Sequence, residues 1–193
     1  MELPISNPVT ANYSLTERLG YLRLKGDTSG ITQGKRVTFT GRRQQHENFS
    51  ASTSLDFKPG NENDEAGLTE FMDYKSHYDL SVKNINGKRM LVLAYNLGMI
   101  KHVEKQIVLG DGTVELKVEG FIKRAGYSTE SLYTFSFSQN GKTYEQISTI
   151  DGKYLSTETT GGFTGVYLGM FATGNGQKSV TNADFDWFDY KHK

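Results

Sequence analysis

The chain has 193 residues, with 22 basic and 22 acidic side chains, four histidines and no cysteine. This length fits one core, and the balanced charge gives no field that would gather nucleic acid or an anionic membrane surface. The lack of cysteine excludes disulfides, thiolate metal sites and a cysteine nucleophile, and no stretch approaches the roughly 20 apolar residues that span a bilayer.

Residues 1–14 hold two of the three prolines and show little periodicity, so we interpret them as a lead-in or the remnant of a linker. The opening MELPISNPVT has neither a basic nor an apolar region of the kind that export signals carry. No signal peptide is expected, and the location stays open between the cytoplasm and periplasm of a bacterium. We assign residues 15–193 to a single domain.

Short strands are predicted in chain order over 21–24, 37–39 and 49–57, where apolar residues alternate with polar ones. An acidic loop over 59–65 precedes a strand over 66–72. Strands over 78–82 and 90–95 flank Asn86-Gly87, a type I′ turn signal. Further strands are predicted over 114–118, 133–137 and 144–150, the last two joined by a hairpin turn at Asn140-Gly141, and then over 165–171 and 183–190.

These strands are separated by short turns, and no convincing helix lies between them. The pattern predicts an all-β fold of two stacked antiparallel sheets, with about ten to twelve strands. The periodic apolar positions predict the core, which consists of Phe39, Phe49, Leu55, Phe57, Leu68, Leu80, Leu91, Leu93, Leu116, Val118, Phe135, Val166 and Leu168.

Three groups of polar residues are candidates for a site. Asp184 and Asp186 share a face of the last strand, and three interpretations stay open: solvent-facing carboxylates, calcium ligands, or an acid/base pair. The polar run 41–46 contains Arg42, Arg43 and Gln45. It is either an edge strand protected by charge or a row that faces a sugar or another domain.

The third group lies around a turn. Tyr74, His77 and Asp79 could form a platform for a sugar, or His77 could be an ordinary surface histidine while Tyr78 packs inward. The four histidines show no metal-ligand spacing, so a zinc site is not expected. The Glu-x-Asp-x-Glu pattern of sandwich glucanases, the GxSxG elbow and the Walker phosphate loop do not occur in the sequence.

Several segments together resemble one family, the concanavalin-A-like C-terminal domain of family 43 β-xylosidases, which is also regarded as a xylan-binding module. The segments are GYLRLKG at 20–26, GRRQQH at 41–46, EAGL at 65–68, HYDL at 77–80, GFTG at 162–165, GNG at 174–176 and ADFDWF at 183–188. They occur in family order. The resemblance implies a jelly-roll sandwich of the lectin and glucanase type.

The resemblance also implies a function. In such enzymes a five-bladed propeller carries the catalytic carboxylates, and a phenylalanine that matches Phe163 helps to shape its substrate pocket. The residues before Tyr21 are too few for a propeller, so we expect a non-catalytic module of a β-xylosidase or α-L-arabinofuranosidase that acts on xylan or xylo-oligosaccharides. Such sandwiches often hold one structural calcium ion, for which Asp184 and Asp186 are the expected ligands. A free-standing lectin-like protein and a small glucanase are the alternatives.

Overall fold

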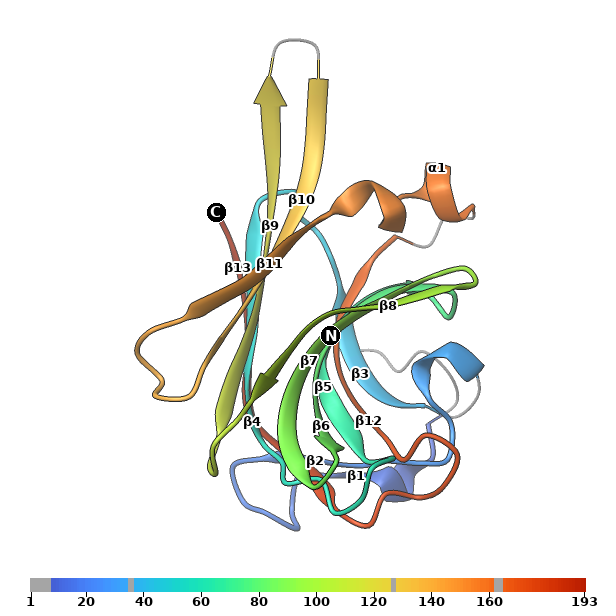
Figure 1. The fold of residues 1–193 in the computed structure, drawn as a ribbon, viewed down its shortest axis with the longest axis vertical. Helices are drawn as coiled ribbons and strands as arrows, with labels where there is room; N and C mark the ends of the chain where they lie inside the picture. Colours follow the sequence, from blue (N-terminus) through green and yellow to red (C-terminus); the bar gives the residue numbers. More distant parts are fainter. Residues whose placement is uncertain (1–7, 35–36, 126–127, 162–164) are drawn as a thin grey trace.

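The computed structural model describes residues 8–34, 37–125, 128–161 and 165–193. Two antiparallel sheets stack on each other, with strand orders β1-β2-β13-β4-β9-β10-β11 and β3-β12-β5-β6-β7-β8 (Figure 1). The predicted all-β sandwich is confirmed. Among the described residues, none of the helices has the length and apolar composition that a membrane crossing requires.

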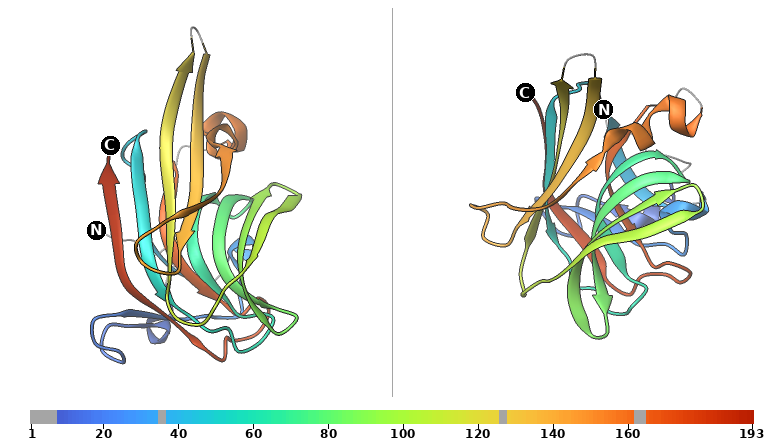
Figure 2. Two further views of the ribbon diagram at one scale, coloured as in Figure 1. Left: turned by 60° about the vertical axis from the view of Figure 1, so that its left-hand side comes forward. Right: turned by 45° about the horizontal axis from the view of Figure 1, so that its top comes forward.

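The two sheets contain seven and six strands. The first comprises β1 (Tyr13–Ser14), β2 (Leu22–Lys25), β13 (Asn182–His192), β4 (Phe49–Asp56), β9 (Val114–Ala125), β10 (Ser128–Ser138) and β11 (Glu145–Asp151). The second comprises β3 (Thr38–Arg43), β12 (Tyr167–Thr173), β5 (Glu65–Asp73), β6 (Ser76–Ile85), β7 (Lys88–Leu97) and β8 (Ile100–Val108). The helical turns are η1 (Thr10–Asn12), η2 (Ile31–Gln33), η3 (Gly152–Leu155) and α1 (Thr157–Thr160). Figure 2 shows the β9–β10 hairpin projecting beyond the rest of the sandwich.

Every residue predicted for the core is buried. Twelve of the thirteen lie in the cluster between the sheets or at its margin, but Phe39 belongs to a second, smaller cluster with Ile31, Val37, Phe71 and Phe171. This second cluster lies on the outer face of the six-stranded sheet. There the phenyl ring of Phe39 packs directly on Gly169, so closely that a β-carbon at Gly169 would overlap the ring. The six-stranded sheet is therefore packed on both faces along part of its width.

The two predicted hairpin turns have different outcomes. Asn86 and Gly87 have φ of 54° and 76°, as a type I′ turn requires, and that prediction is confirmed. The prediction of a tight turn at Asn140-Gly141 is wrong, because β10 ends at Ser138 and β11 begins only at Glu145. The Asn140 side-chain oxygen instead accepts hydrogen bonds from the amides of Lys142 and Thr143, both at 2.9 Å, and stabilises a longer loop.

Strand β8 was not predicted. All of its residues except Ile107 are exposed, because it is the edge strand of the six-stranded sheet. An exposed edge strand needs no alternation of apolar and polar residues, so its sequence carries no period-two signal. Its position still matters, since it borders the pocket described below.

Glu70 is an exception to the apolar character of the space between the sheets. It points inward from β5 between Leu68 and Met72, is 0% exposed, and neither carboxyl oxygen has a hydrogen-bond partner among the residues that the structure describes. Burial raises its pKa well above the ordinary 4.5 of a glutamate. The carboxyl group is therefore protonated in the folded domain over a range of pH in which the unfolded chain is ionised.

This burial makes stability depend on pH. Above pH 4.5 the unfolded chain releases the Glu70 proton while the folded domain keeps it, so the free energy of unfolding falls by about 1.4 kcal/mol per pH unit until the folded pKa is reached. We expect Glu70→Gln to flatten this decline in denaturant melts recorded from mildly acidic to neutral pH. Glu130→Gln, at an exposed ion pair with Lys123, is the matched control. Parallel curves for wild type and Glu70→Gln would contradict the prediction.

Candidate functional site

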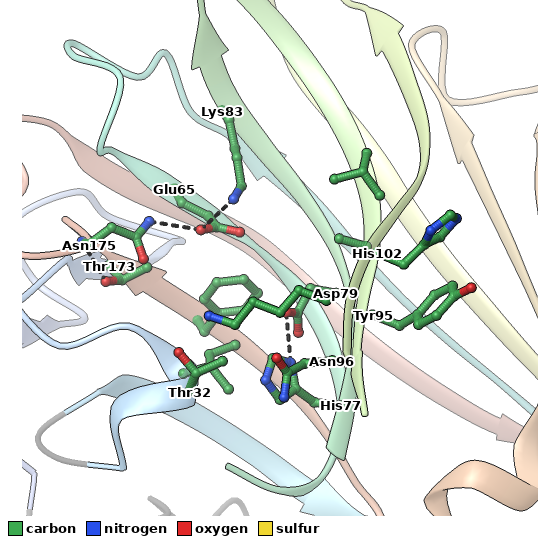
Figure 3. A pocket seen from close by; sticks show the side chains of 15 residues that line it. Thr32, Glu65, His77, Asp79, Lys83, Tyr95, Asn96, His102, Thr173 and Asn175 are labelled. Carbon is green, nitrogen blue, oxygen red and sulfur yellow. Dashed lines mark hydrogen bonds and ion pairs between the residues drawn. The ribbon is translucent and has the colours of Figure 1, made fainter. Parts of the chain in front are cut away.

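A polar pocket of about 270 Å³ opens on the outer face of the six-stranded sheet (Figure 3). The register of the strands arranges the floor of the pocket in two rows that run across the sheet. One row consists of the cross-strand neighbours Thr69, Asp79 and Ala94, and the other consists of His77 and Asn96. Besides Asp79, Ala94, His77 and Asn96, the lining residues are Ile31, Thr32, Glu65, Lys83, Tyr95, Lys101, His102, Val103, Phe171, Thr173 and Asn175.

His77 and Asp79 form an ion pair at the bottom of this pocket. The imidazole Nδ1 lies 2.8 Å from Asp79 Oδ2, and the Thr69 hydroxyl donates to Asp79 Oδ1 at 2.6 Å. Burial lowers the pKa of His77, but the charge and hydrogen bond of Asp79 outweigh this effect and hold the pKa above the ordinary 6.5. The interpretation of His77 as a surface histidine is wrong, since it is 2% exposed.

Two buried polar atoms lie beneath the pocket. His77 Nε2 and Asn96 Oδ1 have no hydrogen-bond partner among the described residues, although Asn96 Nδ2 donates to the Lys75 carbonyl at 2.6 Å. Buried polar atoms are usually satisfied by protein or by ordered water. Both atoms are shielded from the pocket interior, so they do not form part of its accessible surface.

Glu65 organises the other side of the pocket. Its Oε1 accepts from Ser81 at 2.8 Å, while its Oε2 lies 2.9 Å from Lys83 Nζ and accepts from Asn175 Nδ2 at 2.8 Å. Asn175 has a φ of 44°, a left-handed conformation that brings its side chain back toward β5. The pocket thus presents matched positive and negative groups on a rigid sheet.

The predicted turn residues separate in the structure. Tyr74 alone lies in the turn between β5 and β6, where it packs against Phe71 with ring centroids 5.4 Å apart. His77 and Asp79 lie within β6 and line the pocket, whereas Tyr78 points inward and is fully buried, as expected. The predicted platform around the turn is therefore not a single surface.

Arg42 and Gln45 form a second candidate region at one end of the sandwich. The Arg42 guanidinium lies 4.1 Å above the ring of Tyr190 and donates to Gln45 Oε1 at 2.6 Å, and the Gln45 amide donates to the Tyr190 hydroxyl at 3.2 Å. His46 Nδ1 also lies 3.2 Å from that hydroxyl. β3 is an edge strand, as one interpretation of the polar run expected, but the strand ends at Arg43.

Arg43 lies on the other side of β3, opposite Tyr167 of β12. Its guanidinium covers Gly165, which has a φ of 70°, so that a β-carbon there would lie 2.9 Å from Arg43 Nη2. Arg43 therefore packs against the chain segment that follows the Phe163 loop. Phe163 itself lies outside the described residues.

Asp184 is not a solvent-facing carboxylate. It is 5% exposed and accepts hydrogen bonds from Arg23 Nε at 2.7 Å and from Arg18 Nη1 at 2.9 Å. Burial raises its pKa, but the two arginines outweigh this and lower it, so Asp184 is ionised. Asp186 is exposed and lies within the bulge of β13 between Phe185 and Phe188.

Metal binding by this strand stays a prediction. No group of three or more histidine, aspartate or glutamate side chains in the described part of the chain could hold a metal ion. The carboxylate of Asp184 already has two arginine partners. A calcium ion near Asp186 would need backbone carbonyls and water as its remaining ligands.

The sequence pattern did not predict most of the residues that form the pocket and its network of hydrogen bonds. Ser81 and Lys83 alternate with buried Leu80 and Val82, so they look like the solvent side of a half-buried strand. Lys101 and Val103 come from β8, which was not predicted. The available signal was Asn175, because a GNG sequence allows the left-handed backbone that turns its side chain toward Glu65.

The ion pair gives a direct test of this geometry. We expect Asp79→Asn to lower the pKa of His77, because burial then opposes protonation without the adjacent carboxylate. The measurement is a pH titration of the histidine ring signals by NMR. His192, which stacks on His46, should titrate unchanged in the same samples. An unaltered His77 titration would mean that Asp79 does not set its protonation.

The comparisons with known proteins agree in one family. A sequence model described as the beta xylosidase C-terminal concanavalin A-like domain matches residues 4–191. A non-reducing end alpha-L-arabinofuranosidase from Bacteroides ovatus is 40% identical over 187 residues, which are 97% of this chain and 34% of that protein. A xylan 1,3-beta-xylosidase from a Vibrio species is 31% identical in an alignment of 197 positions that covers 96% of this chain and 34% of that protein.

Solved structures show the same partial coverage. The Bacteroides ovatus xyloglucan PUL protein GH43B matches with a TM-score of 0.87 and 37% identity, over 97% of this chain and 36% of that one. A xylan beta-1,4-xylosidase from Bacillus halodurans matches with a TM-score of 0.82 and 29% identity, over 95% of this chain and 35% of that one. The chain thus spans about a third of the length of the curated relatives it matches.

Proposed function

The chain belongs to the β-xylosidase C-terminal concanavalin A-like domain family of glycoside hydrolase family 43, and from this premise we propose that it is the non-catalytic accessory domain of an enzyme that acts on xylan or arabinoxylan. One observation carries the proposal: nearly the whole chain matches only a third of relatives that are named as xylosidases and arabinofuranosidases. The catalytic domain of those relatives is absent from this chain.

The chemistry of the described carboxylates supports a non-catalytic role. Glycoside hydrolysis needs one carboxyl group that is protonated and a second that is ionised, set across the scissile bond. Asp184 is held ionised by two arginines, and protonated Glu70 is sealed between the sheets, away from any substrate. Asp79 is paired with His77. None of these three is arranged as a general acid facing a partner carboxylate.

In this proposal the Arg42 end of the sandwich faces the catalytic domain, and Phe163 helps to form the mouth of its substrate pocket. Arg42 and Gln45 are fixed against Tyr190, which gives this end an ordered polar surface. Arg43 packs over Gly165 beside the Phe163 loop. The role of Phe163 rests on its match to the family's Phe-Thr-Gly loop.

The isolated chain should show no glycosidase turnover. We expect no release of chromophore from aryl β-xylosides or aryl arabinofuranosides, because none of Asp184, Glu70 and Asp79 is arranged as a general acid facing a partner carboxylate. The assay compares the purified chain with a preparation of Asp184→Asn. Turnover that is present in the wild type and vanishes in Asp184→Asn would contradict the non-catalytic assignment.

The contact with the catalytic domain can be tested in the full-length enzyme. We expect Phe163→Ala to lower kcat/KM for xylo-oligosaccharides at least tenfold, about 1.4 kcal/mol of transition-state stabilisation, because an aromatic wall of the pocket is lost. Phe121→Ala, at a partly exposed phenylalanine of β9, is the matched control and should leave kcat/KM unchanged. Full activity together with a lower melting temperature in Phe163→Ala would place Phe163 in the core instead.

A further inference from the structure

We propose that the pocket on the outer face of the six-stranded sheet binds one unit of a neutral saccharide, at a site separate from the Arg42 end. The proposal rests on the proposed function for its ligand class. Its location rests on the geometry of Glu65, Asp79, Lys83 and Asn175 around the pocket (Figure 3). Glu65, Asp79 and Lys83 lie on strands, and Asn175 lies in the turn from Gly174 to Gln177 that begins the connection between β12 and β13.

The polar groups of the pocket match the chemistry of sugar hydroxyls. A hydroxyl group both donates and accepts a hydrogen bond, so it can bridge a carboxylate and an ammonium group. The pocket holds one such pair, Glu65 with Lys83 at 2.9 Å, and beside it the carboxylate of Asp79, which lies 2.8 Å from the His77 imidazole. Hydrogen bonds that involve a charged partner are about twice as strong as neutral ones.

The size and the apolar lining also fit a sugar ring. The volume of about 270 Å³ lies just below the range of roughly 300–1,000 Å³ typical of pockets for drug-sized ligands, which favours one sugar unit over an extended chain. Ile31, Ala94, Val103 and Phe171 supply apolar surface for the C–H groups of the ring. A sugar has both kinds of surface, and so does this pocket.

The site is organised before a ligand arrives. Thr69 and His77 hold the two oxygens of Asp79, and Ser81 and Asn175 hold those of Glu65. A ligand hydroxyl therefore meets two carboxylates whose positions are already fixed, which lowers the entropic cost of binding.

The charges favour a neutral ligand. Glu65 is paired with Lys83, and the carboxylate of Asp79 is hydrogen-bonded to Thr69 and His77, so both carboxylates of the interior already have partners. A charged ligand would have to compete with these contacts, whereas a neutral one can add hydrogen bonds without displacing them. Lys101 adds a positive charge only at the exposed rim, on β8.

The test is an NMR titration of the isotope-labelled 193-residue chain with xylobiose, taken to tens of millimolar. We expect the signals of β5, β6 and the His77 ring to shift, while those of residues 42–46 stay in place. Lys83→Met and Asp79→Asn should each weaken binding at least tenfold. Lys123→Met, which removes an exposed ion-paired lysine from β9, is the matched control for Lys83 and should bind as the wild type does.

The wild-type shift map decides the outcome even if a variant fails to fold. No shift at the pocket, shifts confined to residues 42–46, or binding of xylonate but not xylobiose would each overturn the proposal. The two proposals fail separately. If xylobiose shifts the NMR signals of the pocket while Phe163→Ala leaves kcat/KM of the full-length enzyme unchanged, saccharide binding at the pocket is supported and the contact with the catalytic domain is refuted. If xylobiose causes no shift at the pocket while Phe163→Ala lowers kcat/KM, the contact is supported and saccharide binding at the pocket is refuted.

Discussion

Strands β5 and β6 lie in the middle of the six-stranded sheet and are buried on both faces over most of their length. Their inner face packs against the other sheet, and the two carboxylates on their outer face find their partners on neighbouring strands and in the turn that contains Asn175. Asp79 is satisfied by Thr69 and His77, and Glu65 by Ser81, Lys83 and Asn175. The pocket is the opening left above this network of paired groups.

The alternation of apolar and polar residues predicted the sandwich and all thirteen core positions, because one face of each strand has to be buried. The same alternation could not reveal the pocket. Ser81 and Lys83 occupy positions that would face water in a sheet with one covered face, and only the packing of η2 and β8 beside them makes a cavity. The sequence pattern also could not show that Asp184 is buried in an ion pair, because its partner Arg18 is 166 residues away along the chain. The candidate role of Phe163 came from resemblance alone.

The two regions with functional potential lie on one sheet but use different parts of it. Arg42 and Gln45 are attached to the edge strand β3 and to Tyr190 of the opposite sheet. The pocket is built three strands further in, on β6 and its neighbours. Arg42 lies on the face of β3 opposite to Phe39 and contacts Tyr190, whereas the pocket opens on the outer face, where Phe171 of the second cluster contributes to its lining. An accessory domain with this layout can contact a catalytic domain at one end and keep a second surface free.

The last strand of the chain is not an edge. β13 lies between β2 and β4 in the seven-stranded sheet, and its Asp184 holds Arg18 and Arg23 from the first segment of the domain. A ribosome makes β2 and β4 long before it makes β13, so the two remain unjoined while some 120 intervening residues emerge. The seven-stranded sheet can therefore be completed only after the ribosome has synthesised β13, which ends at residue 192. A nascent chain paused short of that point exposes two unpaired strand edges, and folding must wait for the final strand.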